Sequence, residues 1–268
     1  MTRAHYTHKY MSNPQHPLTV NVIGAGGTGS QVVTCLGRLD ATLAALGHPG
    51  LYVRVYDPDD VDTPNIGRQK FGDADLGRNK AECLVTRINA FFGTGWEAVP
   101  AKYPTTMKDM KKDDLANIYI TCTDNITSRY ELSTLLKLLL DWRKAKNRTD
   151  IDYSCPLYWM DYGNNQKTGQ VIVGTLSAKI DQPKNGKFEG VAKLPWITDL
   201  DGYNGLSDDD SGPSCSHAEA LAKQDLFINS TLAELGMTIL WRMIRQGYIL
   251  QHGVFLNLET MTMNPMPV

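Results

Sequence analysis

A glycine-rich turn between a strand pattern and a helix pattern constrains this fold more than any other feature of the sequence. Residues 18–23 (LTVNVI) alternate as a strand does, residues 24–30 (GAGGTGS) interrupt the pattern, and residues 31–46 carry apolar side chains at helical spacing. Glycines let the backbone turn sharply and approach a phosphate group, which the free N–H groups of a helix N-terminus attract. The turn predicts a nucleotide site, although NAD, FAD, S-adenosylmethionine and ATP would all suit it. Its candidate residues are Gly24, Gly26, Gly27 and Gly29.

Strand and helix patterns continue to alternate along the first half of the chain. This alternation predicts an α/β fold of the doubly wound, Rossmann-like kind, with a mainly parallel sheet. Further on, two strand patterns joined by a glycine-containing turn predict an antiparallel portion towards the C-terminus. Strands are expected at residues 51–56, 96–99, 117–122, 157–161 and 170–176, and helices at residues 79–92, 127–146 and 216–245.

The 268 residues are close to the upper size at which one core suffices, so we expect a single domain. Residues 1–17 are interpreted as an N-terminal arm and residues 18–268 as the domain. Pro, Gly, Asn and Asp crowd residues 180–215, which predicts a long crossover loop. A terminal hairpin is expected at residues 248–258, turning at His252 and Gly253.

Composition excludes several classes of protein. A formal net charge of −2 without a Lys/Arg stripe gives no reason to expect binding to nucleic acid. The apolar runs are too short to cross a bilayer, and the N-terminal residues lack the apolar core of a secretory signal, so a cytoplasmic location is expected. The five cysteines show no Cys-x-x-Cys spacing. We therefore expect reduced thiols, and neither a disulfide framework nor a zinc site.

Charged residues follow the second strand pattern in an order that bears on chemistry. Asp57 ends that strand, where a carboxylate can hold the ribose of a nucleotide, although it could instead serve a turn or helix cap. Arg68 and Lys80 come soon after it. A dehydrogenase has no chemical need for this pair, whereas an adenylating enzyme must neutralise charge as a carboxylate attacks the α-phosphate of ATP. As isolated residues, both are also compatible with a polar loop.

Asp124 follows the strand pattern at residues 117–122. Ligands of doubly wound sheets bind beyond the carboxyl ends of the strands, so this carboxylate is expected at the same crevice as the glycine turn. A lone aspartate suits Mg²⁺, which prefers one or two carboxylates together with water and phosphate oxygens. Alternatively, Asp124 or Thr123 caps the helix that follows.

Taken in order, these residues resemble the ubiquitin-activating (ThiF/MoeB/HesA) superfamily. GAGGTGS, the strand end at Asp57, the run at residues 65–69 (NIGRQ), Lys80 and the run at residues 123–125 (TDN) occur in the order of that family. The resemblance implies an adenylyltransferase that uses ATP and Mg²⁺ to activate the C-terminal carboxylate of a small ubiquitin-like β-grasp protein. It further implies that Asn65, Arg68, Gln69 and Lys80 contact the triphosphate and that Asp124 coordinates Mg²⁺.

More narrowly, residues 213–221 and the chain length resemble the ThiF-family protein of bacterial PRTRC gene systems. The resemblance implies a homodimer. Two departures bear on it: the paired Cys-x-x-Cys motifs of many members are absent, and Arg3 is only a weak match to the N-terminal arginine that completes a partner's site.

Cys215 is a candidate nucleophile for a thioester step, because it lies before a predicted helix, where a thiolate is favoured. The nearby Asp208, Asp209 and Asp210 oppose a thiolate, so a structural thiol is the alternative.

Two other functions stay open at this stage. A nicotinamide-dependent oxidoreductase could use the same glycine turn, and a non-catalytic module could have kept the fold to hold a partner protein.

Overall fold

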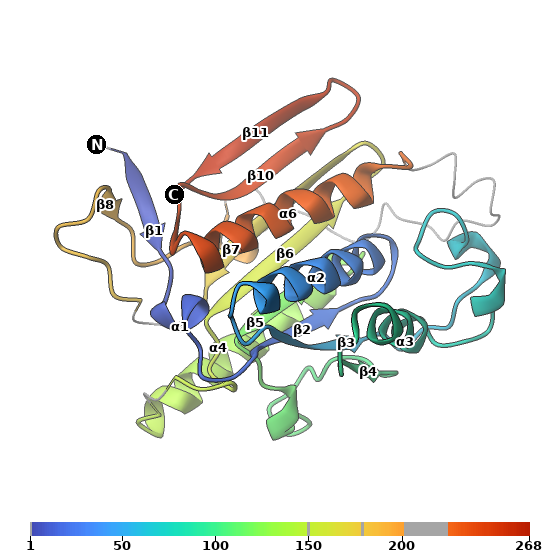
Figure 1. The fold of residues 1–268 in the computed structure, drawn as a ribbon, viewed down its shortest axis with the longest axis horizontal. Coiled ribbons are helices and arrows are strands. Elements are labelled where there is room, and N and C mark those ends of the chain that lie inside the picture. Colours follow the sequence, from blue (N-terminus) through green and yellow to red (C-terminus); the bar gives the residue numbers. More distant parts are fainter. Residues whose placement is uncertain (1, 149–150, 178–179, 201–224) are drawn as a thin grey trace.

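An eight-stranded sheet forms the centre of the protein (Figure 1). The computed structural model describes residues 2–148, 151–177, 180–200 and 225–268. The strand order is β11-β10-β7-β6-β5-β2-β3-β4. The bounds are β2 Leu18–Ile23, β3 Leu51–Tyr56, β4 Glu97–Val99, β5 Ile118–Thr121, β6 Tyr158–Asn164, β7 Thr168–Thr175, β10 Gln251–Asn257 and β11 Thr262–Pro267.

Strands β2 to β6 are parallel, and β7, β10 and β11 join them in antiparallel pairing. Every residue of β2 is buried, as expected for a central parallel strand covered on both faces. The predicted fold class is therefore confirmed: a mainly parallel, Rossmann-like α/β sheet with an antiparallel C-terminal portion.

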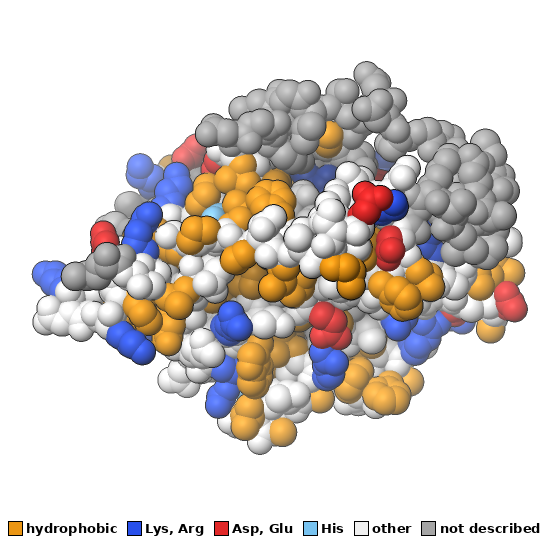
Figure 2. Space-filling model, turned by 90° about the horizontal axis from the view of Figure 1, so that it is seen from above, with side chains coloured by type: hydrophobic (Ala, Val, Ile, Leu, Met, Phe, Trp, Pro, Cys, Tyr) orange, Lys and Arg blue, Asp and Glu red, His pale blue; other side chains and the backbone are white. Residues whose placement is uncertain are grey.

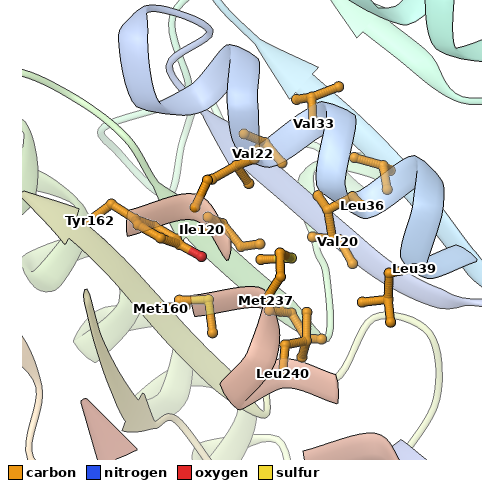
Figure 3. Close-up of a cluster of buried hydrophobic side chains, with 14 of the residues drawn as sticks. Val20, Val22, Val33, Leu36, Leu39, Ile120, Met160, Tyr162, Met237 and Leu240 are labelled. Atoms are coloured by element: carbon orange, nitrogen blue, oxygen red, sulfur yellow. The ribbon is translucent and has the colours of Figure 1, made fainter. Parts of the chain in front are cut away.

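Helices cover both faces of this sheet. On one face, α2, α3 and α6 enclose the larger core, where Val22 of β2, Leu36 of α2 and Met237 of α6 lie together (Figure 3). On the other face, α4 packs Leu132, Leu135 and neighbouring side chains over a second core. The bounds are α2 Gly27–Ala45, α3 Lys80–Phe92, α4 Ile126–Ala145 and α6 Ile228–Arg245, with short 3-10 helices at Thr63–Asn65 (η1), Asp73–Asp75, Lys112–Asp114 and Ile197–Asp199.

The C-terminal hairpin departs from the sequence-based expectation. His252 and Gly253 lie inside β10 rather than at a turn, and the chain reverses between Asn257 and Thr262. Gly253 has a packing reason: an added Cβ would lie 2.8 Å from the Val171 carbonyl oxygen of β7. The expected turn at these two residues is wrong, because the glycine permits close approach of strands rather than chain reversal.

The first residues of the chain pack against distant segments. Strand β1 (Arg3–Tyr6) pairs with β8 (Glu189–Gly190) and β9 (Tyr248–Ile249), and helix α1 (Lys9–Ser12) follows it. His5 is fully buried, with Nδ1 2.7 Å from the Val191 carbonyl and Nε2 3.0 Å from the Tyr158 hydroxyl. Because a carbonyl only accepts, Nδ1 carries a proton, and in the neutral ring Nε2 would accept from the Tyr158 hydroxyl. These two contacts hold β1 in place.

Acidification is expected to destabilise the protein through this histidine. Burial, reinforced by His252, lowers the pKa of His5, and burial also lowers the pKa of His252. The unfolded chain then binds more protons than the folded one, so stability is full above about pH 6.5 and falls as the pH drops below that value. Urea unfolding at pH 7.5 and 5.5 should show this fall in the wild type and a smaller one in His5→Gln.

The exposed His16 provides a control, since His16→Gln should keep the wild-type pH dependence. An equal fall in His5→Gln and wild type would contradict the role of His5.

The surface gives two further observations. Basic, acidic and apolar side chains are interspersed on the face seen in Figure 2. In the part of the chain that the structure describes, no helix has the length and apolarity needed to span a bilayer.

Candidate nucleotide-binding site

The glycine turn joins β2 to α2 at the carboxyl edge of the parallel strands. Gly24 has φ +96°, and an added Cβ would lie 2.9 Å from the Cys122 carbonyl oxygen at the end of β5. An added Cβ on Gly29 would overlap the Gly24 carbonyl oxygen. At Gly26, by contrast, an added Cβ would have no atom of the described residues within 4 Å. The turn is thus packed tightly on its inner side and open at Gly26, as a phosphate cradle must be.

Three helices begin at this edge of the sheet. Helix α2 starts at Gly27, directly after β2. Asn79 caps α3 by accepting from the Glu82 N–H, and Asn125 caps α4 by accepting from the Ser128 N–H. The positive ends of these helix dipoles converge on one region, which favours a bound anion.

Asp57 follows β3 and ties it to the glycine turn. Its Oδ2 accepts from the Ala25 N–H at 2.6 Å, and its Oδ1 accepts from the Asp59 N–H at 2.9 Å. Burial raises the pKa of this carboxyl, while these N–H donors and the nearby Lys80 oppose the rise. Each carboxylate oxygen keeps one lone pair, so Asp57 can still accept from a ribose hydroxyl.

Lys80 is the first residue of α3, and it is only 8% exposed. Its ammonium lies 3.0 Å from the Asp59 carboxylate, whose side chain is 65% exposed. The preceding residue, Asn79, donates to the Asp57 carbonyl at 2.9 Å, which holds the start of α3 against the end of β3. The structure therefore places the predicted cation beside the predicted ribose ligand.

The loop containing η1 brings three more of the predicted residues to the glycine turn. Asn65 closes η1 by accepting from the Asp62 N–H, and its carbonyl accepts from the Gln69 N–H. Next along the chain, the Lys70 N–H donates to Ser30 Oγ in the first turns of α2. Arg68 is half-buried between these contacts, and burial lowers its pKa while the Asp124 carboxylate raises it.

Asp124 is exposed, between β5 and α4. The residues on either side of it are held by Arg129, whose Nη2 donates to the Thr123 carbonyl at 2.8 Å and whose Nη1 donates to the Asn125 carbonyl at 3.2 Å. Arg129 is itself paired with Asp161 of β6, at 2.9 and 3.1 Å from Nε. This buried ion pair fixes the backbone that presents Asp124.

Sequence reasoning missed Asp59, Asp161 and the clamping role of Arg129. A signal existed for Asp161, because a carboxylate inside an apolar strand must find a partner. Its partner was not visible, since the β5–β6 register that sets Thr121 opposite Asp161 is a property of the fold. Cys215, the predicted nucleophile, lies outside the described residues. Within those residues, Cys35, Cys83, Cys122 and Cys155 are free thiols, and no cluster of three metal-ligating side chains occurs.

A hollow of about 280 Å³ lies between α2 and α6, away from the glycine turn. Cys35, Arg38, Glu234 and Trp241 are among its lining residues. The Arg38–Glu234 ion pair spans it at 2.6 Å, and burial, the larger effect, together with Glu234 raises the pKa of Cys35 to about 11. A thiol of that pKa is a poor nucleophile, so the sheet edge remains the stronger candidate site.

Comparison with known proteins finds one family that matches part of this chain. A model of the ThiF family matches residues 16–139, a segment that contains the glycine turn, Asp57, Arg68, Lys80 and Asp124. No curated protein gave a match.

Solved structures share the fold. PaaA is 15% identical with a TM-score of 0.58, and the alignment covers 95% of this chain and 64% of that one. E. coli MccB is 13% identical with a TM-score of 0.56, covering 93% and 62%. MccB solved with ATP is 14% identical with a TM-score of 0.52, covering 93% and 63%. The chain therefore spans less than two thirds of the length of these proteins.

Proposed function

We propose that this protein is a ThiF-type adenylyltransferase, which uses ATP to activate the C-terminal carboxylate of a small ubiquitin-like β-grasp protein. The carrying observation is that the chain segments bearing Arg68, Lys80 and Asp124 meet the glycine turn at one edge of the sheet. The Lys70 N–H donates to Ser30, Asp59 links Lys80 to Asp57, and the backbone at Thr123 packs against Gly24. Two cations and a carboxylate at a phosphate cradle suit chemistry on a triphosphate. The structural similarity to MccB, which has been solved with ATP, supports ATP as the nucleotide.

The residues present fit a bound nucleotide. Gly26 leaves open space where a side chain would stand. Gln69 is buried, and its Oε1 accepts no hydrogen bond from the described residues, a cost that a ligand donor would relieve. In the proposed site Asp57 binds the ribose, the N–H groups of residues 26–29 face the phosphates, and Arg68 and Lys80 neutralise the oxygens that gain charge.

The reaction joins the substrate carboxylate to the α-phosphorus of ATP and breaks the bond to pyrophosphate. A C-terminal carboxylate is ionised at neutral pH, so the protein needs to orient the reactants and stabilise charge rather than supply a strong base. Mg²⁺, held by Asp124, would shield the phosphate charge. Transfer of the acyl group to the Cys215 thiol, with release of AMP, is a further part of the proposal.

The partner protein, the subfamily, the oligomeric state and the cellular location are also part of the proposal. MccB has been solved together with AMPCPP and MccA, which is compatible with a second component bound next to a nucleotide. Assignment to the PRTRC-type ThiF proteins, a homodimer and a cytoplasmic location rest on the sequence resemblance and composition.

ATP–pyrophosphate exchange in the presence of a candidate β-grasp protein tests the activity. We expect exchange by the wild type and a loss of about a hundredfold or more in Arg68→Ala and in Asp124→Ala, because each removes a charge from the reacting phosphates. Arg38→Ala and Glu234→Ala, which remove exposed charges of the same signs on the α2–α6 face, should keep wild-type exchange.

Full exchange by Arg68→Ala and Asp124→Ala would refute the assigned site. Intact-mass measurement of the same mixture reports an acyl-adenylate and a thioester, and loss of only the thioester in Cys215→Ala would establish the second step. Binding of NAD rather than ATP would favour the oxidoreductase alternative, and partner binding indifferent to ATP and to these substitutions would favour a non-catalytic module.

A further inference from the structure

Lys80 occupies a position that is unfavourable for a cation. It is the first residue of α3, so its charge lies at the positive end of the helix dipole. It is also 92% buried, and a buried ammonium needs a partner. The free energy of the folded protein therefore depends on an anion beside Lys80.

Asp59 provides that anion in the structure. Its carboxylate lies 3.0 Å from Lys80 Nζ. Its backbone is fixed on both sides, since its N–H donates to Asp57 and its carbonyl accepts from the Lys80 N–H and from the Asn79 amide. The carboxylate itself is largely solvent-exposed, whereas the ammonium is not. Moving Asp59 away into water therefore costs little, provided that another anion takes its place at Lys80.

We propose that Asp59 is a placeholder for phosphate, a residue that neutralises Lys80 until a polyphosphate replaces it. The inference rests on the proposed function and adds a determinant of phosphate specificity to it. A triphosphate or pyrophosphate carries enough charge to compete with a tethered carboxylate, whereas adenosine carries none. Asp59 thus restricts binding at Lys80 to ligands that carry enough negative charge to displace its carboxylate. After the reaction, return of Asp59 to Lys80 favours release of pyrophosphate.

Calorimetric titration of Asp59→Asn with ATP, pyrophosphate and adenosine, each with Mg²⁺, tests this role. Asparagine has the size of aspartate but no charge, so Lys80 becomes available. We expect binding of ATP and pyrophosphate to tighten by about three- to tenfold, the range of a partly exposed ion pair, and adenosine binding to stay within about twofold of the wild type.

Asp60→Asn is the matched control for charge alone. Asp60 is the next residue and is exposed, and in the described part of the chain it forms no ion pair with Lys80. It should therefore tighten ATP binding less than Asp59→Asn does. In a Lys80→Met background, Asp59→Asn should change ATP affinity no more than Asp60→Asn does. The reason is that Lys80, the cation for which Asp59 and phosphate compete, is absent.

Two results separate the placeholder role from the proposed function. If the wild type binds ATP and Asp59→Asn binds ATP and pyrophosphate no more tightly, or more weakly, the placeholder role is wrong while the nucleotide site stands. If the folded wild type, checked by circular dichroism, binds neither ATP nor pyrophosphate, the nucleotide site fails and the placeholder role fails with it.

Discussion

Arg129→Met is expected to lower the free energy of unfolding by about 3–5 kcal/mol and to reduce ATP–pyrophosphate exchange by about a hundredfold. The stability loss follows because Asp161, 1% exposed, would keep a buried charge without its partner. The activity loss follows because Arg129 donates to the carbonyls of Thr123 and Asn125, and displacement of the intervening Asp124 by about 1 Å is enough to disturb a positioned ligand. Urea unfolding and the exchange assay measure the two effects.

Arg129→Lys separates the two effects if the methionine variant does not fold. Lysine keeps a charge opposite Asp161 but lacks the planar fork that reaches several carbonyls at once. It should therefore recover part of the stability and little of the exchange. Lys167→Met breaks the exposed Lys167–Glu259 pair and should cost at most about 1 kcal/mol with no loss of exchange. Equal stability losses in Arg129→Met and Lys167→Met would show that burial of the first pair is irrelevant.

The sequence predicted those features of the fold that depend on local pattern. The apolar alternation of β2 and β3 and the glycines between β2 and α2 lie close together in the chain, so their structure could be read directly. Helix α2 begins at Gly27, earlier than the expected start near residue 31. The expected start is too late because glycine has a low helix propensity, although glycines are required at an N-terminus that approaches phosphate.

Features that depend on pairing between distant residues could not be predicted in this way. Strand β1 has four residues and is held by partners more than 180 positions away, so no local pattern distinguishes it from an arm. The Arg129–Asp161 pair likewise joins α4 to β6. In the candidate site the positions of Asp57 and Asp124 follow from the strand ends, whereas the contact between Lys80 and Asp59 depends on how the loop after β3 meets α3.

Alanine substitutions at two glycines of the same turn are expected to differ in their effect on stability, with a larger loss in Gly29→Ala than in Gly26→Ala. Gly29→Ala places a methyl group against the Gly24 carbonyl oxygen, which is backbone and cannot move aside, so we expect a loss of about 2 kcal/mol or more in the free energy of unfolding. Gly26→Ala meets open space, so its cost should stay within about 1 kcal/mol, the usual penalty of alanine at a helix N-cap. Urea unfolding of both variants measures the difference.

ATP binding should be weakened in Gly26→Ala even though this variant stays folded. The methyl group of Gly26→Ala enters the space proposed for the phosphates, so ATP binding should weaken by about tenfold, equivalent to about 1.4 kcal/mol. Gly95→Ala is the control, because Gly95 also has open space around it but precedes β4, at the opposite edge of the sheet. Wild-type ATP affinity in Gly26→Ala would mean that the open side of the glycine turn does not face the nucleotide.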